Sequence, residues 1–272
     1  MGGLLASEIF RLRKRLMPYV LLGLLLAIVG LLYLLLWLVV QVEAEEGTGA
    51  SELEAVISLS NVLGDGMDLA YSVAGVMAII PAATLVSSEY AWGTIRTLLP
   101  RSAGRDAFMG AKAIVTIGFT LAVAITGFVG ALIASWIVST MGDFSRDLPS
   151  DFAAEAVLAI LRTTLAMLPY ATFAFMIALL SRSTAAGIGV GLAMYFLDDT
   201  ITLLLGTAGD TGETLSEFLI DANVSALMAA NHVEPPGDHF SAWRGAAVLV
   251  FYSAAFLAVS IWRFRTRDVH VN

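Results

Sequence analysis

The side chains with the clearest binding chemistry in this chain lie in one short stretch, residues 88–112. Its charged side chains are four basic and two acidic: Arg96, Arg101, Arg105, Lys112, Glu89 and Asp106. Apolar runs flank the stretch on both sides, and each is long enough to cross a bilayer. A short basic loop between two membrane spans belongs on the cytoplasmic side. We therefore expect this loop to face the cytoplasm, where a soluble partner can bind it.

Within this loop, a short helix is expected before Pro100. Ser87 or Ser88 is placed to cap it, and Glu89 then lies near its positive N-terminal end. Ile95, Leu98 and Leu99 give the helix an apolar edge. These features predict a docking helix at the membrane surface; the alternative is an ordinary loop held by anionic lipid.

The remaining residue types argue against catalysis by this chain. A phosphate-binding P-loop needs a lysine between glycine and Ser or Thr, and neither Lys14 nor Lys112 follows a glycine. The three histidines form no HExxH zinc motif, and no Gly-x-Ser-x-Gly elbow occurs. The absence of cysteine excludes thiolate sites and disulfides. We expect no enzyme activity, no metal and no cofactor bound by this chain.

The composition indicates an integral membrane protein. Hydrophobic residues make up 58% of the 272 residues, charged residues only 14%, and the mean hydropathy is +0.83, all outside the range of soluble domains. The expected fold is all-α, a single transmembrane domain over residues 1–272. A separate soluble domain is not expected, because membrane spans account for most of the length.

Runs of about 20 apolar residues suffice to cross a bilayer as a helix. Six such runs are present, at residues 18–40, 69–87, 113–139, 155–181, 184–207 and 243–264. Before them, residues 4–17 have apolar side chains at helical spacing among basic ones, which predicts a helix lying along the inner membrane surface. The alternative is a charged start to the first span.

The distribution of charge predicts the orientation. With six spans and a basic start, both termini lie in the cytoplasm, and 12 of the 15 Lys and Arg residues then fall on or near that side. The predicted outer loops, 41–68 and 208–242, are acidic instead. Short amphipathic helices are expected in them at residues 51–63 and 215–230.

Two predicted spans contain irregular residues. Pro81 and Pro169 fall inside the second and fourth spans and should kink them. Arg162 in the fourth span and Asp198 and Asp199 in the fifth are predicted at similar depth in the membrane. Unpaired charge at that depth is costly, so Arg162 pairing with one aspartate is one hypothesis; contact of all three with interfacial water is the other. Residues 200–205 then form a candidate re-entrant segment.

One motif resembles a known family, the ABC-2 type transporter permeases, in the loop between their second and third spans. It reads Glu89-x-x-x-Gly93-Thr94-x-Arg96-x-Leu98-Leu99-Pro100-Arg101-Ser102-x-x-Arg105, followed by Gly110-x-Lys112. The N-terminal Glu8-x-x-Arg11-x-Arg13 is similar to the family's opening interface helix. The length and the six-span plan with both termini inside also agree with that family.

The resemblance implies the transmembrane subunit of an ATP-binding cassette exporter in a bacterial or archaeal plasma membrane. Such a subunit pairs with a second permease copy or a related permease, contacts membrane lipids and no nucleic acid, and carries a separate ATPase subunit that uses ATP and Mg²⁺. The loop would be the coupling helix. The resemblance assigns that role to Glu89, Gly93, Thr94, Arg96, Leu99, Arg101 and Arg105.

A second class of function fits the same features. A non-transporting membrane assembly factor or sensor would also have acidic outer loops, no ATPase motif and a basic loop that binds lipid or a regulator. A neighbouring reading frame that encodes a P-loop protein would favour the transporter.

Overall fold

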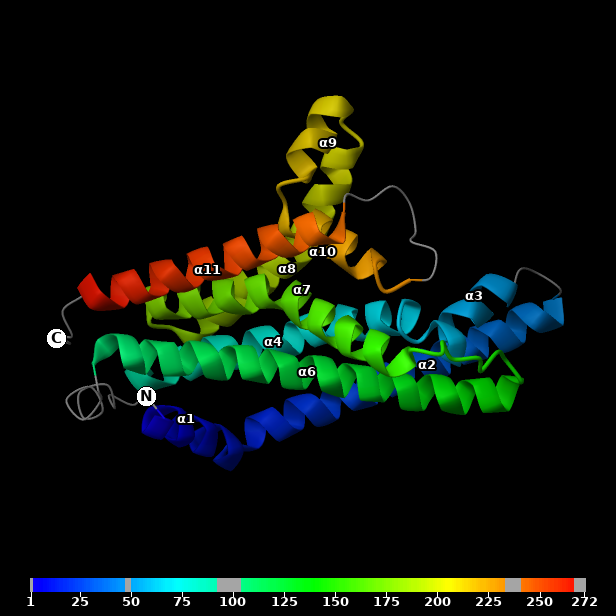
Figure 1. The fold of residues 1–272 in the computed structure, drawn as a ribbon, viewed down its shortest axis with the longest axis horizontal. Helices are drawn as coiled ribbons and strands as arrows, with labels where there is room; N and C mark the ends of the chain where they lie inside the picture. Colours follow the sequence, from blue (N-terminus) through cyan, green and yellow to red (C-terminus); the bar gives the residue numbers. More distant parts are fainter. Residues whose placement is uncertain (1, 47–49, 92–103, 233–240, 267–272) are drawn as a thin grey trace.

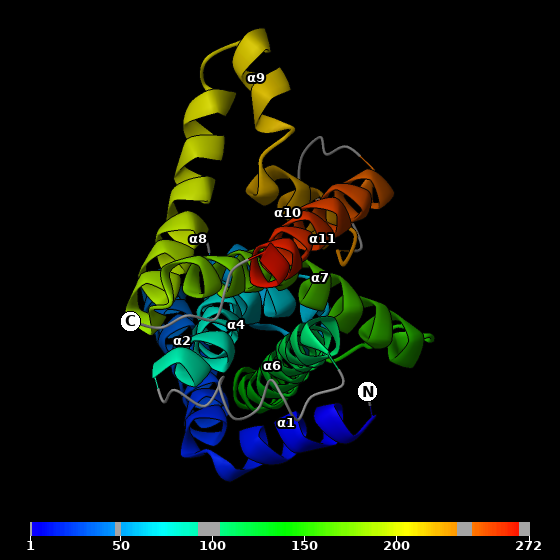
Figure 2. The same cartoon turned by 90° about the vertical axis from the view of Figure 1, so that its left-hand side faces the viewer.

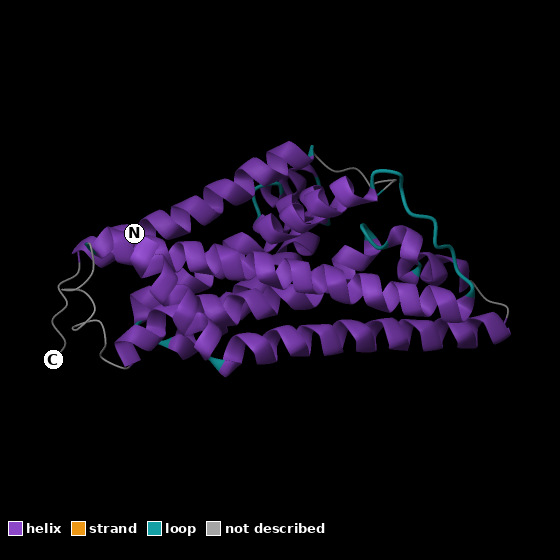
Figure 3. Cartoon of the chain, turned by 60° about the horizontal axis from the view of Figure 1, so that its bottom comes forward, coloured by secondary structure: helices purple, strands orange, loops and turns teal. Residues whose placement is uncertain are grey.

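The structure, a computed structural model, describes residues 2–46, 50–91, 104–232 and 241–266 (Figure 1). Within these ranges every regular element is a helix (Figure 3). In chain order the helices are α1 (Gly2–Lys14), α2 (Leu16–Glu46), α3 (Ala50–Ile57), η1 (Leu59–Asn61), α4 (Asp65–Ala91), α6 (Arg105–Gly142), α7 (Phe152–Ser181), α8 (Thr184–Gly206), α9 (Asp210–Ser216), α10 (Ile220–Ala229) and α11 (Ala242–Thr266).

Six of these helices are long and apolar enough to cross a membrane, which confirms the all-α class and the six predicted spans. They cover Leu16–Glu43, Asp65–Glu89, Asp106–Gly142, Phe152–Ser181, Thr184–Gly206 and Ala242–Thr266. The largest difference is at the third span, which begins at Asp106 rather than at residue 113. The chain is therefore a multi-pass helical membrane protein.

α7 lies at the centre of the bundle, is largely buried, and packs against α4, α6, α8 and α11 (Figures 1 and 2). α2 lies on the outside of α6 and α4. α6 has 38 residues, or about 57 Å as a helix, which exceeds a hydrocarbon core of about 30 Å. α8 leans away from the bundle, and α9 folds back beside its far end (Figure 2).

The N-terminal helix α1 is separate from the first span. It ends at Lys14 and runs across the end of the bundle, along the outside of α6 (Figure 2). The sequence predicted one helix over residues 4–17, so its existence is confirmed and its end lies three residues earlier. Its place at a membrane surface remains a prediction.

Three expectations for the connecting segments change. The helix predicted over 51–63 is two short elements, α3 and η1, and the helix predicted over 215–230 is interrupted between α9 and α10. The prediction of a re-entrant segment at 200–205 is wrong, because α8 continues without a break to Gly206. Pro81 and Pro169 lie inside α4 and α7, where the predicted kinks remain untested.

Candidate functional site

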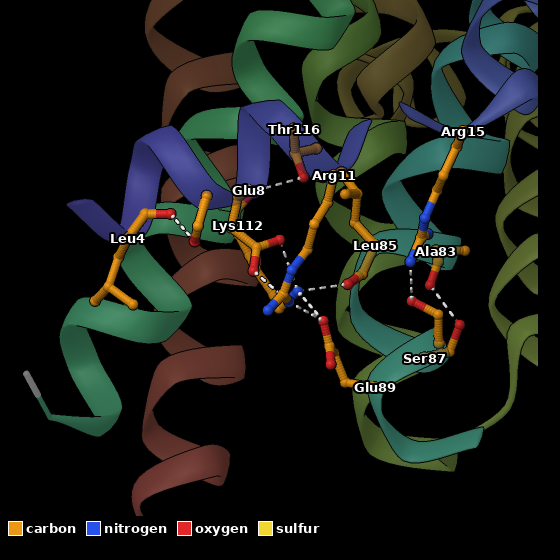
Figure 4. Close-up of polar contacts among 12 residues, drawn as sticks. Leu4, Glu8, Arg11, Arg15, Ala83, Leu85, Ser87, Glu89, Lys112 and Thr116 are labelled. Atoms are coloured by element: carbon orange, nitrogen blue, oxygen red, sulfur yellow. Dashed lines mark hydrogen bonds and ion pairs between the residues drawn. The ribbon is translucent and has the colours of Figure 1, made fainter. Parts of the chain in front are cut away.

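A buried cluster of charges joins three helices at one end of the bundle (Figure 4). Glu8 comes from α1, Glu89 from the last turn of α4, and Lys112 from about two turns into α6. These side chains are at most 5% exposed. In the sequence, Glu89 precedes and Lys112 follows the segment 92–103, which is outside the described residues.

Lys112 is the centre of the cluster. Its Nζ donates to Glu8 Oε2 at 3.0 Å, to Glu89 Oε1 at 3.1 Å and to the carbonyl oxygen of Leu85 at 2.9 Å. An ammonium group has three hydrogens to donate, so its capacity is filled. The Nζ also lies 5.0 Å from the centre of the Phe108 ring, a cation–π distance.

Arg11 on α1 is the second cation of the cluster. Its Nη1 lies 3.3 Å from Glu8 Oε1 and 3.1 Å from Glu89 Oε1. The cluster therefore contains two carboxylates and two cations, which compensate each other. Arg15, between α1 and α2, adds a further link to α4 through a 3.3 Å bond from its Nη2 to Ser88 Oγ.

The position of each residue in its helix explains why these charges need one another. Glu8 and Arg11 are three residues apart and so share one face of α1. Glu89 lies where the carboxyl end of α4 carries partial negative charge, an unfavourable place for an acid. Lys112 and Arg11 compensate for that position. A buried charge is tolerated when it is paired and hydrogen-bonded in this way.

The predicted helix start near Glu89 is wrong, while the rest of that predicted helix, up to Pro100, lies outside the described residues. α4 runs on through Glu89 to Ala91, so Glu89 ends one helix instead of beginning another. Ser87 does not cap a helix start: its Oγ donates to the carbonyl oxygen of Ala83 and hydrogen-bonds Thr184 Oγ1. The second span continues through Ser87 and Ser88, which the sequence analysis had taken as its end.

The structure describes two of the seven residues assigned to coupling. Glu89 is 3% exposed and held in the charge cluster, so it has almost no surface to offer a partner. Arg105 is the first residue of α6. The other five lie outside the described residues: Gly93, Thr94, Arg96, Leu99 and Arg101.

Sequence reasoning missed the cluster as a unit. Glu8 and Lys112 are 104 positions apart, and no pattern links them before the fold brings α1 onto α6. One signal was present: Lys112 adjoins the apolar run of the third span, and Glu8 lies among the apolar residues of α1. Charges in such positions usually have partners.

The hypothesis that Arg162 pairs with an aspartate is wrong. Arg162 Nη1 instead donates to the carbonyl oxygen of Ala230 at 2.8 Å and to Asn231 Oδ1 at 2.9 Å, just after α10. Asp198 Oδ2 accepts from Tyr170 Oη at 2.8 Å and from the backbone N–H of Asp221, at the start of α10, at 2.7 Å.

The two charges therefore hold opposite ends of the same short helix. The carboxylate of Asp198 lies at the positive amino end of α10, and the guanidinium of Arg162 lies at the negative carboxyl end. Each satisfies a helix terminus that has no intrahelical partner. Asp198 is 1% exposed, so it does not rely on interfacial water either.

His232, just after α10, links the end of that helix to the start of α4. Its Nε2 lies 2.9 Å from Asp68 Oδ2 and its Nδ1 lies 3.8 Å from Asp65 Oδ1. The hydrogen bond to Asp68 raises the pKa of His232, with further attraction from both carboxylates. Gly64 permits this approach, because a Cβ there would lie 2.7 Å from His232 Nδ1.

This link predicts a pH-dependent stability. A His with a raised pKa stabilises the fold fully below its unfolded pKa of about 6.5, and the contribution is lost as pH rises through its folded pKa. The melting temperature of wild type should therefore exceed that of Asp68→Asn by more at pH 5.5 than at pH 8.5. Asp68→Asn also removes a favourable acid from the first turn of α4. That loss is the same at both pH values, so it does not affect the comparison. A difference that does not change with pH would contradict the assignment.

Six apolar helices around a buried core define a multi-pass helical membrane protein. Within that class, the chain belongs to the family described as "Protein of unknown function (DUF2705)", which matches residues 46–270. That range includes Glu89 and Lys112 but not α1.

A curated relative is "Uncharacterized protein YhcI" of Bacillus subtilis (strain 168), which is 22% identical over 206 residues. The match covers 72% of this chain and 64% of the relative, so the chain matches less than two thirds of the relative's length.

Proposed function

We propose that this chain is the permease subunit of an ATP-driven exporter and that residues 88–112 receive a separate ATPase subunit. The observation that carries the proposal is the charge cluster of Glu8, Arg11, Glu89 and Lys112. It joins α1 to the two helices that bracket the loop. A partner that binds the loop would therefore act on a rigid, connected end of the bundle.

The buried charges oppose separation of the three helices. Removing one member of a buried ion pair typically costs about 3–5 kcal/mol, because the remaining charge is left buried and unpaired. Separating α1, α4 and α6 would leave the same charges unpaired, so the three helices should move together. α4 and α6 also pack on the central helix α7. A displacement of the loop would thus reach the centre of the bundle through packed helices.

The remaining parts of the proposal come from the family resemblance and the charge pattern. Both termini and the loop face the cytoplasm, and the chain lies in the plasma membrane as one of two permease copies around the substrate path. ATP and Mg²⁺ are used by the partner ATPase, and this chain catalyses no reaction. Glu89 positions the loop, while Arg96 and Arg101 supply positive charge for an acidic surface of the partner.

The test is affinity capture of the tagged protein in mild detergent, with mass spectrometry and an ATPase assay. Wild type should retain a P-loop subunit, and Arg96→Glu with Arg101→Glu should lose it. Arg146→Glu is the control, because Arg146 is half-exposed, forms its ion pair with neighbouring Asp143 and lies beyond the opposite end of α6. Retention of a nucleotide-binding protein by the double variant would contradict the loop's role. If wild type retains none while folded, the assembly factor or sensor is favoured.

A further inference from the structure

A cavity of about 270 Å³ lies where α4, α7, α8 and α10 meet, away from the charge cluster. It is lined by Tyr71, Ser72, Tyr170, Tyr195, Phe196, Asp199 and Asp221. Four of the seven lining residues are aromatic and two are acidic. Asp199 and Phe196 are exposed and form the open side of the cavity.

The aromatic rings are held in fixed positions. The Tyr195 ring centre lies 6.0 Å from that of Tyr71, 5.1 Å from that of Tyr170 and 5.3 Å from that of Phe196. Tyr195 Oη donates to the carbonyl oxygens of Tyr71 and Ser72 at 3.1 and 3.3 Å. Gly75 makes room for this ring, since a Cβ there would overlap it.

The charge of the cavity is negative and uncompensated. Asp199 and Asp221 line it, and Asp198 lies behind Tyr170. None of these three aspartates forms an ion pair with any residue that the structure describes. Burial, together with repulsion from Asp199 and Asp198, raises the pKa of Asp221 to about 6. A bound cation would remove this repulsion.

The lining selects the kind of cation. A metal ion needs several oxygen ligands at about 2.0–2.6 Å, and the described residues contain no group of three or more His, Cys, Asp or Glu side chains that could hold one. Aromatic faces instead attract alkylammonium groups within about 6 Å of a ring centre. The cavity is also far larger than a bare ion.

We propose that this cavity binds a small organic ammonium ion, with its methyl groups against the rings of Tyr71, Tyr195 and Phe196 and its charge beside Asp199 and Asp221. Tyr170 closes the floor of the cavity and holds Asp198 through its hydroxyl. The site needs no ATPase and no transport, so the inference stands apart from the proposed function.

The test uses choline as the probe and 3,3-dimethyl-1-butanol as its uncharged isostere, with binding to the purified protein in lipid nanodiscs followed by calorimetry. The two molecules have the same shape and differ in charge. Choline should bind at least tenfold more tightly than the alcohol, a ratio equivalent to about 1.4 kcal/mol. Equal affinities, or no binding of choline at about 10 mM, roughly tenfold above the Kd of a weak millimolar ligand, would overturn the proposal.

Variants then locate the site. Asp199→Asn with Asp221→Asn should weaken choline binding at least tenfold, and Phe196→Leu should weaken it by about two- to fivefold, as expected for an exposed cation–π contact. Asp147→Asn, an exposed acid between α6 and α7, is the matched control. Asp199 and Phe196 are exposed, so Asp199→Asn alone and Phe196→Leu should fold even if the double variant does not. Choline binding unchanged in Asp199→Asn and Phe196→Leu would place the ligand elsewhere and reject the site.

Discussion

Replacing Lys112 with Met should be the most damaging single change at the end of the bundle that contains the charge cluster. The substitution keeps an unbranched side chain of similar length, but it leaves Glu8, Glu89 and the Leu85 carbonyl without their shared donor. Arg11 alone cannot compensate for two buried carboxylates. Loss of one partner from a buried ion pair costs about 3–5 kcal/mol, a large part of a typical folding free energy of about 5–15 kcal/mol.

The measurement is the fraction of protein that remains monodisperse after heating in detergent, read by size-exclusion chromatography. Lys112→Met should lose its peak at a much lower temperature than wild type. The chain offers a matched control, because its second lysine, Lys14, is exposed at the end of α1. Lys14→Met should melt like wild type. Similar melting of the two variants would show that the cluster contributes little.

A compensated variant separates stability from coupling. Lys112→Met combined with Glu8→Gln and Glu89→Gln removes all three buried charges. No unpaired buried charge is then left, and replacing a whole buried ion pair by uncharged residues of similar volume costs far less than removing one partner. This triple variant should regain most of the lost melting temperature. Under the proposed function it should still stimulate the partner ATPase less than wild type does, since the charged link from α1 to α4 and α6 is gone.

The sequence was sufficient for the spans because each depends on local composition alone. A run of about 20 apolar residues has no stable alternative to a membrane helix, so all six were located within a few residues apart from the start of α6. The same reasoning missed that α6 and α4 continue into charged residues. Asp106 and Glu89 both lie inside helices, and each has a partner on another helix, Arg265 and Lys112 respectively.

The partners of single charges were not predictable in the same way. Sequence placed Arg162 and Asp198 at a depth where they need partners, and that requirement is correct. Pairing them with each other was wrong because both are satisfied by the ends of α10, whose unbonded backbone groups leave no signature in the sequence. Similarly, α8 passes Asp198 without ending, because α10 supplies the hydrogen bond that water would otherwise provide.

The close-packed seam of α7 against α8 was not predicted, although the sequence contains a Gly-x-x-x-Gly signal for it at residues 187–191. Gly187 and Gly191 lie one turn apart on α8, opposite Ala178 and Ala174 on α7. Small residues at this spacing let membrane helices approach closely. A Cβ at Gly187 would lie 2.5 Å from that of Ala178, and a Cβ at Gly191 would lie 2.7 Å from that of Ala174.

Gly191→Leu should therefore destabilise the protein strongly. The new side chain would force α8 away from α7 and from Ile79 on α4, whose Cγ2 would lie 3.0 Å from the added Cβ. Overpacking of this kind costs about 1–3 kcal/mol in a packed core. The effect should be near or above the upper limit, because α8 is otherwise little buried and this seam carries much of its packing.

The control lies on the same helix. No atom lies within 4 Å of the position that a Cβ would take at Gly189, so Gly189→Leu makes the same chemical change without a clash. Leu is a better helix former than Gly by about 0.8 kcal/mol, and both variants gain that benefit. Gly189→Leu should hold or raise the melting temperature while Gly191→Leu lowers it, so the two changes should have different signs. Equal shifts would mean that α8 is not held by the glycine seam, and the position of Asp198 against α10 would then need another explanation.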